Sequence, residues 1–132
     1  MRVAFVFFVP VLAAFILAGA CAGSEEGVKV AEIELCAAVR DRTPVGAAES
    51  FPSDIAQVYC FTRIVGAQDT TSVQHVWYYG EREMGRVDLS VRSASWRTWS
   101  TKRMAPDWKG TWRVEVVHGD TTVIASKEFI LE

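Results

Sequence analysis

The stretch Arg86-Val87-Asp88-Leu89-Ser90-Val91-Arg92 alternates between polar and apolar residues over its whole length. Successive side chains of a β-strand point to opposite faces of the sheet, so the pattern predicts a strand with one buried and one solvated face. The inward face would carry Val87, Leu89 and Val91. Such a face must pack against a second layer of structure.

Six further stretches carry strand patterns between turn residues. Residues 57–65 are apolar in both phases, which is typical of a central strand covered on both faces. The other predicted strands comprise residues 29–39, 73–79, 94–103, 111–117 and 121–131. Seven short strands without a helix predict one all-β domain, an antiparallel β-sandwich of the immunoglobulin-like type.

The amino-terminal segment differs in composition from this domain. Arg2 is followed by an apolar run, Val3 to Leu17, that is shorter than the roughly 20 residues needed to span a membrane. Small residues, Ala18-Gly19-Ala20, stand directly before Cys21. A positive start, a short apolar core and small residues predict a cleaved signal peptide over residues 1–20.

Two processing routes fit this segment. Its end resembles the lipobox of bacterial lipoproteins, although Leu17 stands one place earlier than in the usual pattern. The rival route is ordinary signal-peptidase cleavage after Ala20 or Ala22. We expect lipidation of Cys21, which would attach the chain to a membrane.

The remaining chain then divides into a tether and a domain. Residues 21–27 are small and acidic, which predicts a flexible tether, and residues 28–132 form the domain. Lipoproteins without Asp after the lipidated Cys are often sent to the outer membrane, so Ala22 indicates a periplasmic, outer-membrane lipoprotein. Without lipidation, the exported chain would be soluble in the periplasm or secreted.

Composition narrows the classes of function. The 132 residues carry a formal net charge of -2, and 50% of them are hydrophobic. These values argue against a disordered chain and against nucleic-acid binding through bulk positive charge. Export also makes nucleic acid a poor ligand, so we expect none. The sequence carries no indication of the oligomeric state.

Two cysteines, Cys36 and Cys60, lie in the domain and would meet an oxidising compartment. A disulfide between them would close a loop of about two dozen residues and stabilise the fold by roughly 3 kcal/mol. The loop holds Pro44 and Phe51-Pro52, the least regular stretch of the domain. We expect this disulfide; the alternative is two separately buried thiols.

Short motifs of aromatic and polar residues follow one another along the domain. They are Val58-Tyr59-Cys60-Phe61-Thr62-Arg63, His75-Val76-Trp77-Tyr78, Ser95-Trp96-Arg97-Thr98-Trp99-Ser100-Thr101-Lys102 and Gly110-Thr111-Trp112-Arg113-Val114-Glu115-Val116, with Phe129 after them. Their order resembles a bacterial family called domain of unknown function 2914, except that Trp99 stands where Tyr is expected. The resemblance implies an exported or membrane-associated β-domain. It implies no established activity and no catalytic residue.

No constellation in the sequence indicates catalysis. His75 and His118 are far apart and outside any metal-ligand spacing, and no glycine-rich phosphate loop follows a strand. We interpret His75 as a half-buried strand residue and His118 as a solvated turn residue. We therefore expect no enzyme activity, no metal and no cofactor. The alternative, a small periplasmic hydrolase acting on cell-wall material, requires a cleft in which His75 or carboxylates converge.

Basic residues interleave with tryptophans between Arg92 and Arg113. Trp96 and Trp99 differ in parity, so a strand would point them to opposite faces. Trp108 lies in a predicted loop, where we expect it to be exposed. The predicted binding surface comprises Arg97, Trp99, Arg103 and Trp108.

This surface predicts a non-catalytic binding or accessory module for an envelope protein or glycan. A sheet stabilised by cross-strand Trp–Arg and Trp–Thr pairs would have the same composition. The sequence leaves these two interpretations open.

Overall fold

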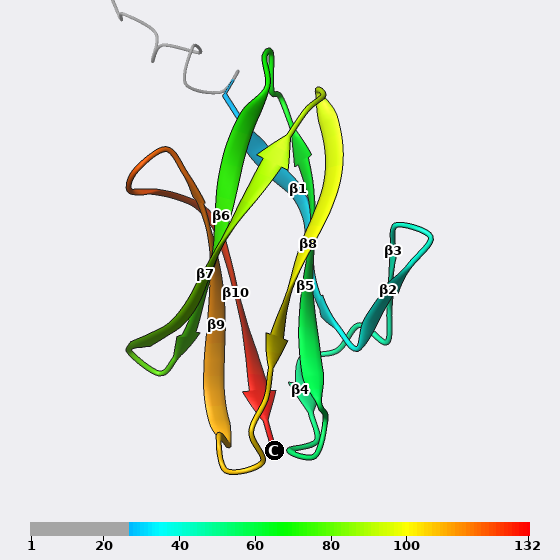
Figure 1. The fold of residues 1–132 in the computed structure, drawn as a ribbon, viewed down its shortest axis with the longest axis vertical. Helices are drawn as coiled ribbons and strands as arrows, with labels where there is room; N and C mark the ends of the chain where they lie inside the picture. Colours follow the sequence, from blue (N-terminus) through cyan, green and yellow to red (C-terminus); the bar gives the residue numbers. More distant parts are fainter. Residues whose placement is uncertain (1–26) are drawn as a thin grey trace, which may run out of the picture.

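The computed structural model describes residues 27–132. They form seven long strands and three short ones (Figure 1). The long strands are β1 (Lys29–Cys36), β5 (Gln57–Val65), β6 (Thr71–Tyr79), β7 (Arg82–Val91), β8 (Ser95–Arg103), β9 (Gly110–His118) and β10 (Thr122–Leu131). The short strands are β2 (Ala38–Arg40), β3 (Thr43–Val45) and β4 (Ser50–Phe51).

Within residues 27–132 there is no helix that could cross a membrane. The expected signal peptide, the lipidation site Cys21 and residues 21–26 of the expected tether lie outside the described residues. Each of the seven long strands overlaps one of the seven predicted strands, which confirms the all-β prediction.

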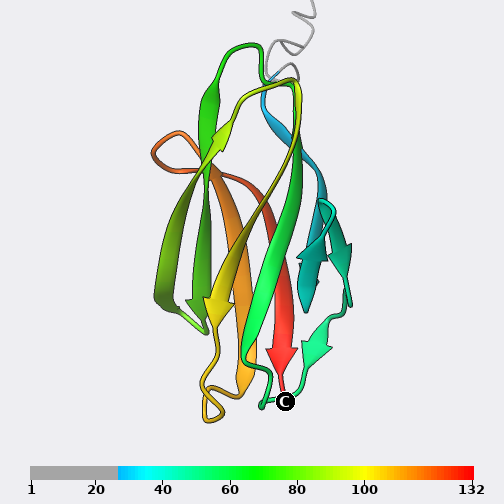
Figure 2. The same ribbon diagram turned by 45° about the vertical axis from the view of Figure 1, so that its right-hand side comes forward.

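Two sheets face each other (Figures 1 and 2). One has the order β1-β5-β8 and the other the order β4-β10-β9-β6-β7. Every pairing is antiparallel except that of β4 with β10. A small hairpin of β2 and β3 stands outside the three-stranded sheet. The arrangement is that of a β-sandwich, and the finer immunoglobulin-like topology stays a prediction.

The core lies between the sheets and follows the predicted alternation. On β7, Leu89 pairs with Val73 and Val87 pairs with the buried His75, so the expected inward face is the observed one. Large aromatic side chains fill the middle of the core; Trp77, Trp112 and Phe129 are at most 1% exposed, and they form edge-to-face and stacked ring pairs. Each such burial stabilises the fold by about 3 kcal/mol.

The first predicted strand is shorter than expected. Residues 29–39 were predicted as one strand, but β1 ends at Cys36 and the chain turns into the β2–β3 hairpin. The two turn residues of this hairpin, Asp41 and Arg42, both have positive φ angles, 51° and 57°. Such angles are those of a tight two-residue hairpin turn, for which Asn-Gly is the usual signature. Because that signature is absent here, the sequence pattern did not reveal the turn.

The expected disulfide between Cys36 and Cys60 does not form, and both thiols are free and buried. In the β1–β5 register, Leu35 is the partner of Cys60, whereas Cys36 is the partner of Tyr59. Cross-strand partners share a face, so the two cysteines lie on opposite faces of the sheet. A bridge would need a register shift by one residue, and the alternative of two separately buried thiols holds instead.

Candidate binding surface

Three of the four predicted surface residues share the outward face of the three-stranded sheet. Arg97, Trp99 and Arg103 alternate along β8, opposite Arg63, Phe61 and Gln57 of β5, respectively. Trp96 has the opposite parity, as expected, and packs against the core. Arg103 lies six residues from Arg97, or about 20 Å along the strand. The structure therefore brings Arg97 and Trp99 together and leaves Arg103 at the far end of the face.

Trp108 has a different role from the one predicted. It is half-buried and packs against the core, with its ring centroid 5.9 Å from that of Trp112. The Trp112 indole N–H donates a 3.0 Å hydrogen bond to the carbonyl oxygen of Trp108. Lys102 Nζ lies 5.9 Å from the centroid of the Trp108 ring. These contacts close one end of the core, so the expectation of an exposed Trp108 was wrong.

Two adjoining hollows lie beside Arg97. One, of about 460 Å³, is lined by residues that include Glu32, Arg63 and Ser95. The other, of about 290 Å³, is lined by residues that include Arg92, Thr98 and Trp99. Both hollows are lined by Arg42, Trp96 and Arg97. We call this combined site the arginine surface.

The arginine surface carries more positive charge than its acids neutralise. Glu32 is the acid among the lining residues, and its Oε1 lies 3.1 Å from Arg63 Nε. Within the described part of the chain, Arg42, Arg92 and Arg97 form no ion pair. Arg63 and Arg97 are also direct cross-strand partners, a placement of like charges that destabilises a sheet. The surface is thus positively charged at some cost to the fold.

The β2–β3 hairpin brings Arg42 to this surface. Its backbone at Val45 and Ala38 hydrogen-bonds the Cys36 thiol, whose pKa burial raises. Phe61 lies on the outward face of β5 yet is only 1% exposed, because β2 packs on this strand. At the tip, Arg97 Nη1 donates a 3.4 Å hydrogen bond to the carbonyl oxygen of Arg42. The hairpin is therefore a fixed part of the surface.

Sequence reasoning missed three residues of the arginine surface: Arg42, Arg63 and Arg92. Arg63 could have been found from its parity in the central strand, since residues 58, 60 and 64 were recognisable as core positions. Arg92 stands at the start of the basic window, but only the fold shows that it lines the same hollow as Trp99. No local pattern places Arg42 there, because its position depends on how the hairpin docks.

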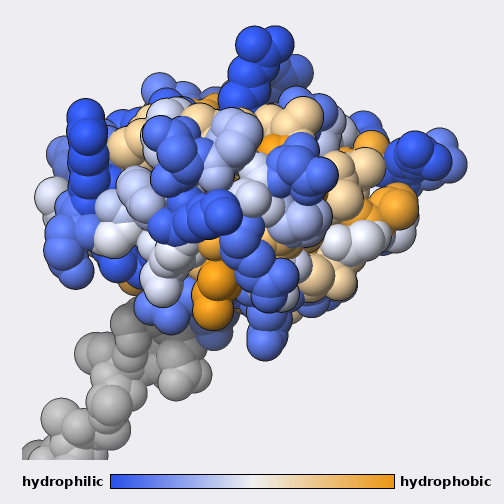
Figure 3. All heavy atoms as spheres, turned by 90° about the horizontal axis from the view of Figure 1, so that it is seen from below, coloured by the Kyte–Doolittle hydropathy of each residue, from blue (hydrophilic) through white to orange (hydrophobic). Residues whose placement is uncertain are grey.

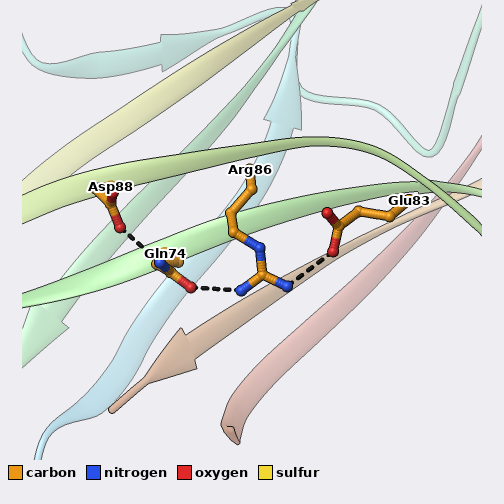
Figure 4. Close-up of polar contacts among 4 residues, drawn as sticks. All are labelled: Gln74, Glu83, Arg86 and Asp88. Carbon is orange, nitrogen blue, oxygen red and sulfur yellow. Dashed lines mark hydrogen bonds and ion pairs between the residues drawn. The ribbon is translucent and has the colours of Figure 1, made fainter. Parts of the chain in front are cut away.

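The opposite face, on the five-stranded sheet, pairs its central charges. Arg86 donates to Gln74 Oε1 at 2.6 Å and to Glu83 Oε1 at 2.8 Å (Figure 4). Gln74 in turn donates to Asp88 Oδ1 at 2.6 Å, and the bond to Glu83 raises the pKa of Arg86. Nearby, Arg113 Nε lies 3.2 Å from Glu115 and its guanidinium lies 4.5 Å from the Tyr78 ring centroid.

A third hollow, of about 630 Å³, opens between β1 and β10. Its lining includes Ile33, Lys127, Phe129 and the half-exposed Ile130. Lys127 Nζ lies 3.4 Å from the carbonyl oxygen of Ile33 and 3.6 Å from a carboxylate oxygen of Glu34. The basic group of this hollow is thus already bound to the protein.

Exposed apolar side chains are scattered. The large ones are Val45 on β3 and Val123 and Ile130 near opposite ends of β10, each 41–49% exposed. Seen from the end that carries the carboxyl terminus, hydrophilic residues dominate, and apolar residues show between them in smaller areas (Figure 3).

His75 lies between the sheets rather than in a cleft. It is fully buried, with Nε2 3.1 Å from Thr62 Oγ1 and Nδ1 2.7 Å from Ser100 Oγ. It is thus more deeply buried than the half-buried residue that we expected. Residue His118 is half-buried and hydrogen-bonds Thr71 Oγ1 at 3.2 Å, so it is held rather than free in the turn.

The hydrogen-bond partners of His75 fix its proton. Thr62 donates its hydroxyl to the carbonyl oxygen of Thr98 at 3.0 Å, so it must accept from His75 Nε2–H. Nδ1 of the neutral ring then accepts from Ser100, which itself accepts from the Trp77 indole N–H at 3.1 Å. Burial lowers the pKa of His75 to about 4, consistent with this neutral form. Among residues 27–132, every buried side-chain nitrogen and oxygen has a partner.

Ser100 and His75 lie together in the core, away from the hollows. Ser100 is 4% exposed and spends its hydroxyl proton on His75, and neither residue lines the three hollows described above. In residues 27–132 no group of three or more His, Cys, Asp or Glu side chains could hold a metal ion.

Comparison with known proteins finds a family similarity in the second half of the chain. Residues 70–130 match a family model described as "Protein of unknown function (DUF2914)". A search of curated proteins found no match to the chain. The matched segment extends from β6 into β10 and contains Arg92, Trp96, Arg97 and Trp99, whereas Arg42 and Arg63 precede it. The match supports the resemblance for the motifs from His75 onward: residues 70–130 are similar to the DUF2914 family, whereas the motif Val58–Arg63 precedes the matched segment.

Proposed function

We propose that this chain is a non-catalytic binding module of the bacterial cell envelope, and that it recognises a protein or glycan partner through the arginine surface. The observation that carries the proposal is the contrast in ion pairing between the two outward faces. Arg86 and Arg113 form ion pairs on the five-stranded sheet, whereas Arg42, Arg92 and Arg97 of the arginine surface form none in the described part of the chain. Charges held without a partner beside concave, tryptophan-lined hollows favour a ligand.

The cellular location is part of the same proposal. The chain would be exported by its amino-terminal segment and held at the outer membrane by a lipid on Cys21, with the soluble periplasmic form as the alternative. The charged leader, its short apolar run and the small residues before Cys21 support this location. Radiolabelled palmitate fed to expressing cells should label the wild-type chain but not Cys21→Ser. An unlabelled wild-type chain would rule out lipidation.

Capture of the partner from envelope fractions tests the binding role. The full chain should retain one set of partners, and Arg97→Ala and Trp99→Ala should each lose it. Arg86→Ala removes the same side chain from the opposite face and should keep the set, which controls for loss of charge. Retention of the same partners by Arg97→Ala and Trp99→Ala would disprove the arginine surface as the binding site.

A further inference from the structure

We propose that the arginine surface binds an anionic sugar, with the acidic group held by Arg97 and Arg42 and the sugar ring packed beside Trp99. This inference rests on the proposed function and names the chemistry of its ligand. A carboxylate or a phosphate on the sugar would serve equally well, because arginine binds both in a two-pronged manner.

The charge of the surface selects for an anion. Arg97 and Arg42 line both hollows, and Arg92 adds a third charge to the smaller one. Glu32 is already paired with Arg63 at the edge of the larger hollow. An anion there would be repelled by Glu32, so the strongest positive site lies toward Arg97, Arg42 and Arg92. An acidic group bound there would also relieve the repulsion between Arg63 and Arg97.

The position of Arg97 supports a two-pronged contact. Its Nη1 donates to the carbonyl oxygen of Arg42 at 3.4 Å, which is at the long limit of a hydrogen bond. This contact orients the guanidinium but leaves most of its five N–H donors without a protein acceptor in the hydrogen bonds described. The side chain is thus exposed, oriented and available.

Trp96 and Trp99 supply an apolar wall next to these donors. Trp96 lines both hollows while its inner edge packs on the core, so its position is fixed. Trp99 is half-buried beside the buried Phe61, its cross-strand partner. An aromatic ring offers the C–H face of a sugar an apolar surface, whereas the acidic group and hydroxyls need the arginine, serine and threonine donors around it.

The shape favours a sugar over a protein or a membrane. The hollows measure about 460 and 290 Å³, which suits one or a few sugar rings. A stable protein interface needs a buried apolar centre, and membrane insertion needs clustered apolar side chains. The large exposed apolar residues are instead separated: Val45 is on β3, and Val123 and Ile130 stand near opposite ends of β10.

Calorimetric titration of the full chain with defined anionic sugars tests the inference. The probes are hexagalacturonate for the carboxylate and glucose 6-phosphate for the phosphate, with the neutral methyl ester and glucose as matched controls. At least one anionic probe should bind, its neutral counterpart should bind at least tenfold more weakly, and added salt should reduce the affinity. Arg97→Ala should weaken binding about tenfold or more, and Arg97→Lys should retain part of it. Arg86→Ala should bind as the wild type does.

Four results would overturn the inference. They are equal binding of acidic and neutral sugars, equal binding by Arg97→Ala, binding of inorganic phosphate without the sugars, and binding only to vesicles that contain phosphatidylglycerol. Failure of all probes to bind at millimolar concentration would overturn it as well. If envelope capture still depended on Arg97 in that case, the proposed function would stand without an anionic sugar as its ligand. Capture that is independent of Arg97 would disprove the proposed function itself.

Discussion

The outward faces of the two sheets differ in how their arginine charges are paired. The five-stranded sheet covers its outer side with a network in which Arg86 bonds both Gln74 and Glu83, so its charge is neutralised within the protein. The three-stranded sheet covers part of its outer side with the β2–β3 hairpin and leaves Arg97 beside another arginine, Arg63. The arginine charge on the first face is therefore neutralised within the protein, whereas on the second face Arg97 has no acidic partner among the described residues.

The largest expected effect comes from removing the apolar support under the hairpin. Phe61→Ala should lower the free energy of unfolding by about 3–5 kcal/mol, because a fully buried ring is lost and the β2–β3 hairpin loses the side chain on which it packs. Val76, which is also fully buried on an outward-parity position, provides the matched site on the other sheet. Val76→Ala should cost less, about 1–3 kcal/mol, because fewer atoms are removed. Urea unfolding of both variants gives the two values.

Phe61→Ala should also weaken anionic binding if the hairpin positions Arg42, whereas Val76→Ala should not. Any comparison has to be made on the fraction of each variant that remains folded. Equal binding by both variants would show that the hairpin does not shape the arginine surface.

Lowering the pH should destabilise the fold through the buried His75, which lies between the two sheets, rather than through the charges on either outward face. His75 has a pKa of about 4 in the fold and an ordinary value of 6.5 in the unfolded chain, so the unfolded chain takes up the proton first. Its contribution to stability is therefore complete above pH 6.5 and is lost as the pH falls toward 4. The total loss should be about 3 kcal/mol.

Chemical unfolding between pH 7 and 4 measures this loss, and NMR of the His75 ring measures its pKa directly. The ring should remain neutral, with the proton on Nε2, down to about pH 4. A His75 ring that titrates near its ordinary value in the folded protein would contradict the directed hydrogen-bond chain.

A smaller effect should follow from reversing one charge of the arginine surface. Arg97→Glu would face Arg63 across the strands and replace a repulsive pair with an attractive one. It should raise the free energy of unfolding by roughly 0.2–1 kcal/mol while abolishing anion binding. Arg86→Glu on the other face would meet Glu83 and should destabilise. Thermal unfolding of the two variants compares the signs; a loss of stability in Arg97→Glu would mean that the arginine pair carries no repulsion.

The smallest expected effect is that of a reductant. Because Cys36 and Cys60 lie on opposite faces of the three-stranded sheet, neither Tm nor electrophoretic mobility of the domain should change on addition of dithiothreitol. Unreduced, denatured protein should take up an alkyl group at each of these cysteines, as mass spectrometry can show. If neither cysteine were alkylated in that experiment, the protein would contain the Cys36–Cys60 disulfide after all.

The strands were predictable because alternation is a local property. The pattern from Arg86 to Val91 and the apolar run of β5 both survive in the structure. The short strands β2, β3 and β4 were not predictable, since two or three residues carry no period and their pairing depends on distant partners. Strand β4, for example, pairs with the very end of β10.

Only the part of the site that lies within one strand could be predicted, because alternation along a strand shows which residues share a face. Arg97 and Trp99 could be placed on one face from their spacing alone, and the structure confirms that placement. The mistakes all involve relations between segments: the register that separates Cys36 from Cys60, and the loop that packs Trp108 on Trp112. Neither the strand register nor the packing of the loop can be predicted from the alternation pattern of a single strand.

The hydrogen-bond chain through His75 also determines how the two sheets are aligned. It passes in one direction from Trp77 through Ser100, His75 and Thr62 to a backbone carbonyl, so each member has one place to donate. Apolar packing alone would tolerate a small sliding of one sheet over the other. Sliding would leave several polar groups without water or partners, each at a cost of about 1–3 kcal/mol. The buried hydrogen bonds thus oppose sliding of the two sheets and keep the strands in one alignment. The outward arginines are therefore held in fixed positions relative to each other.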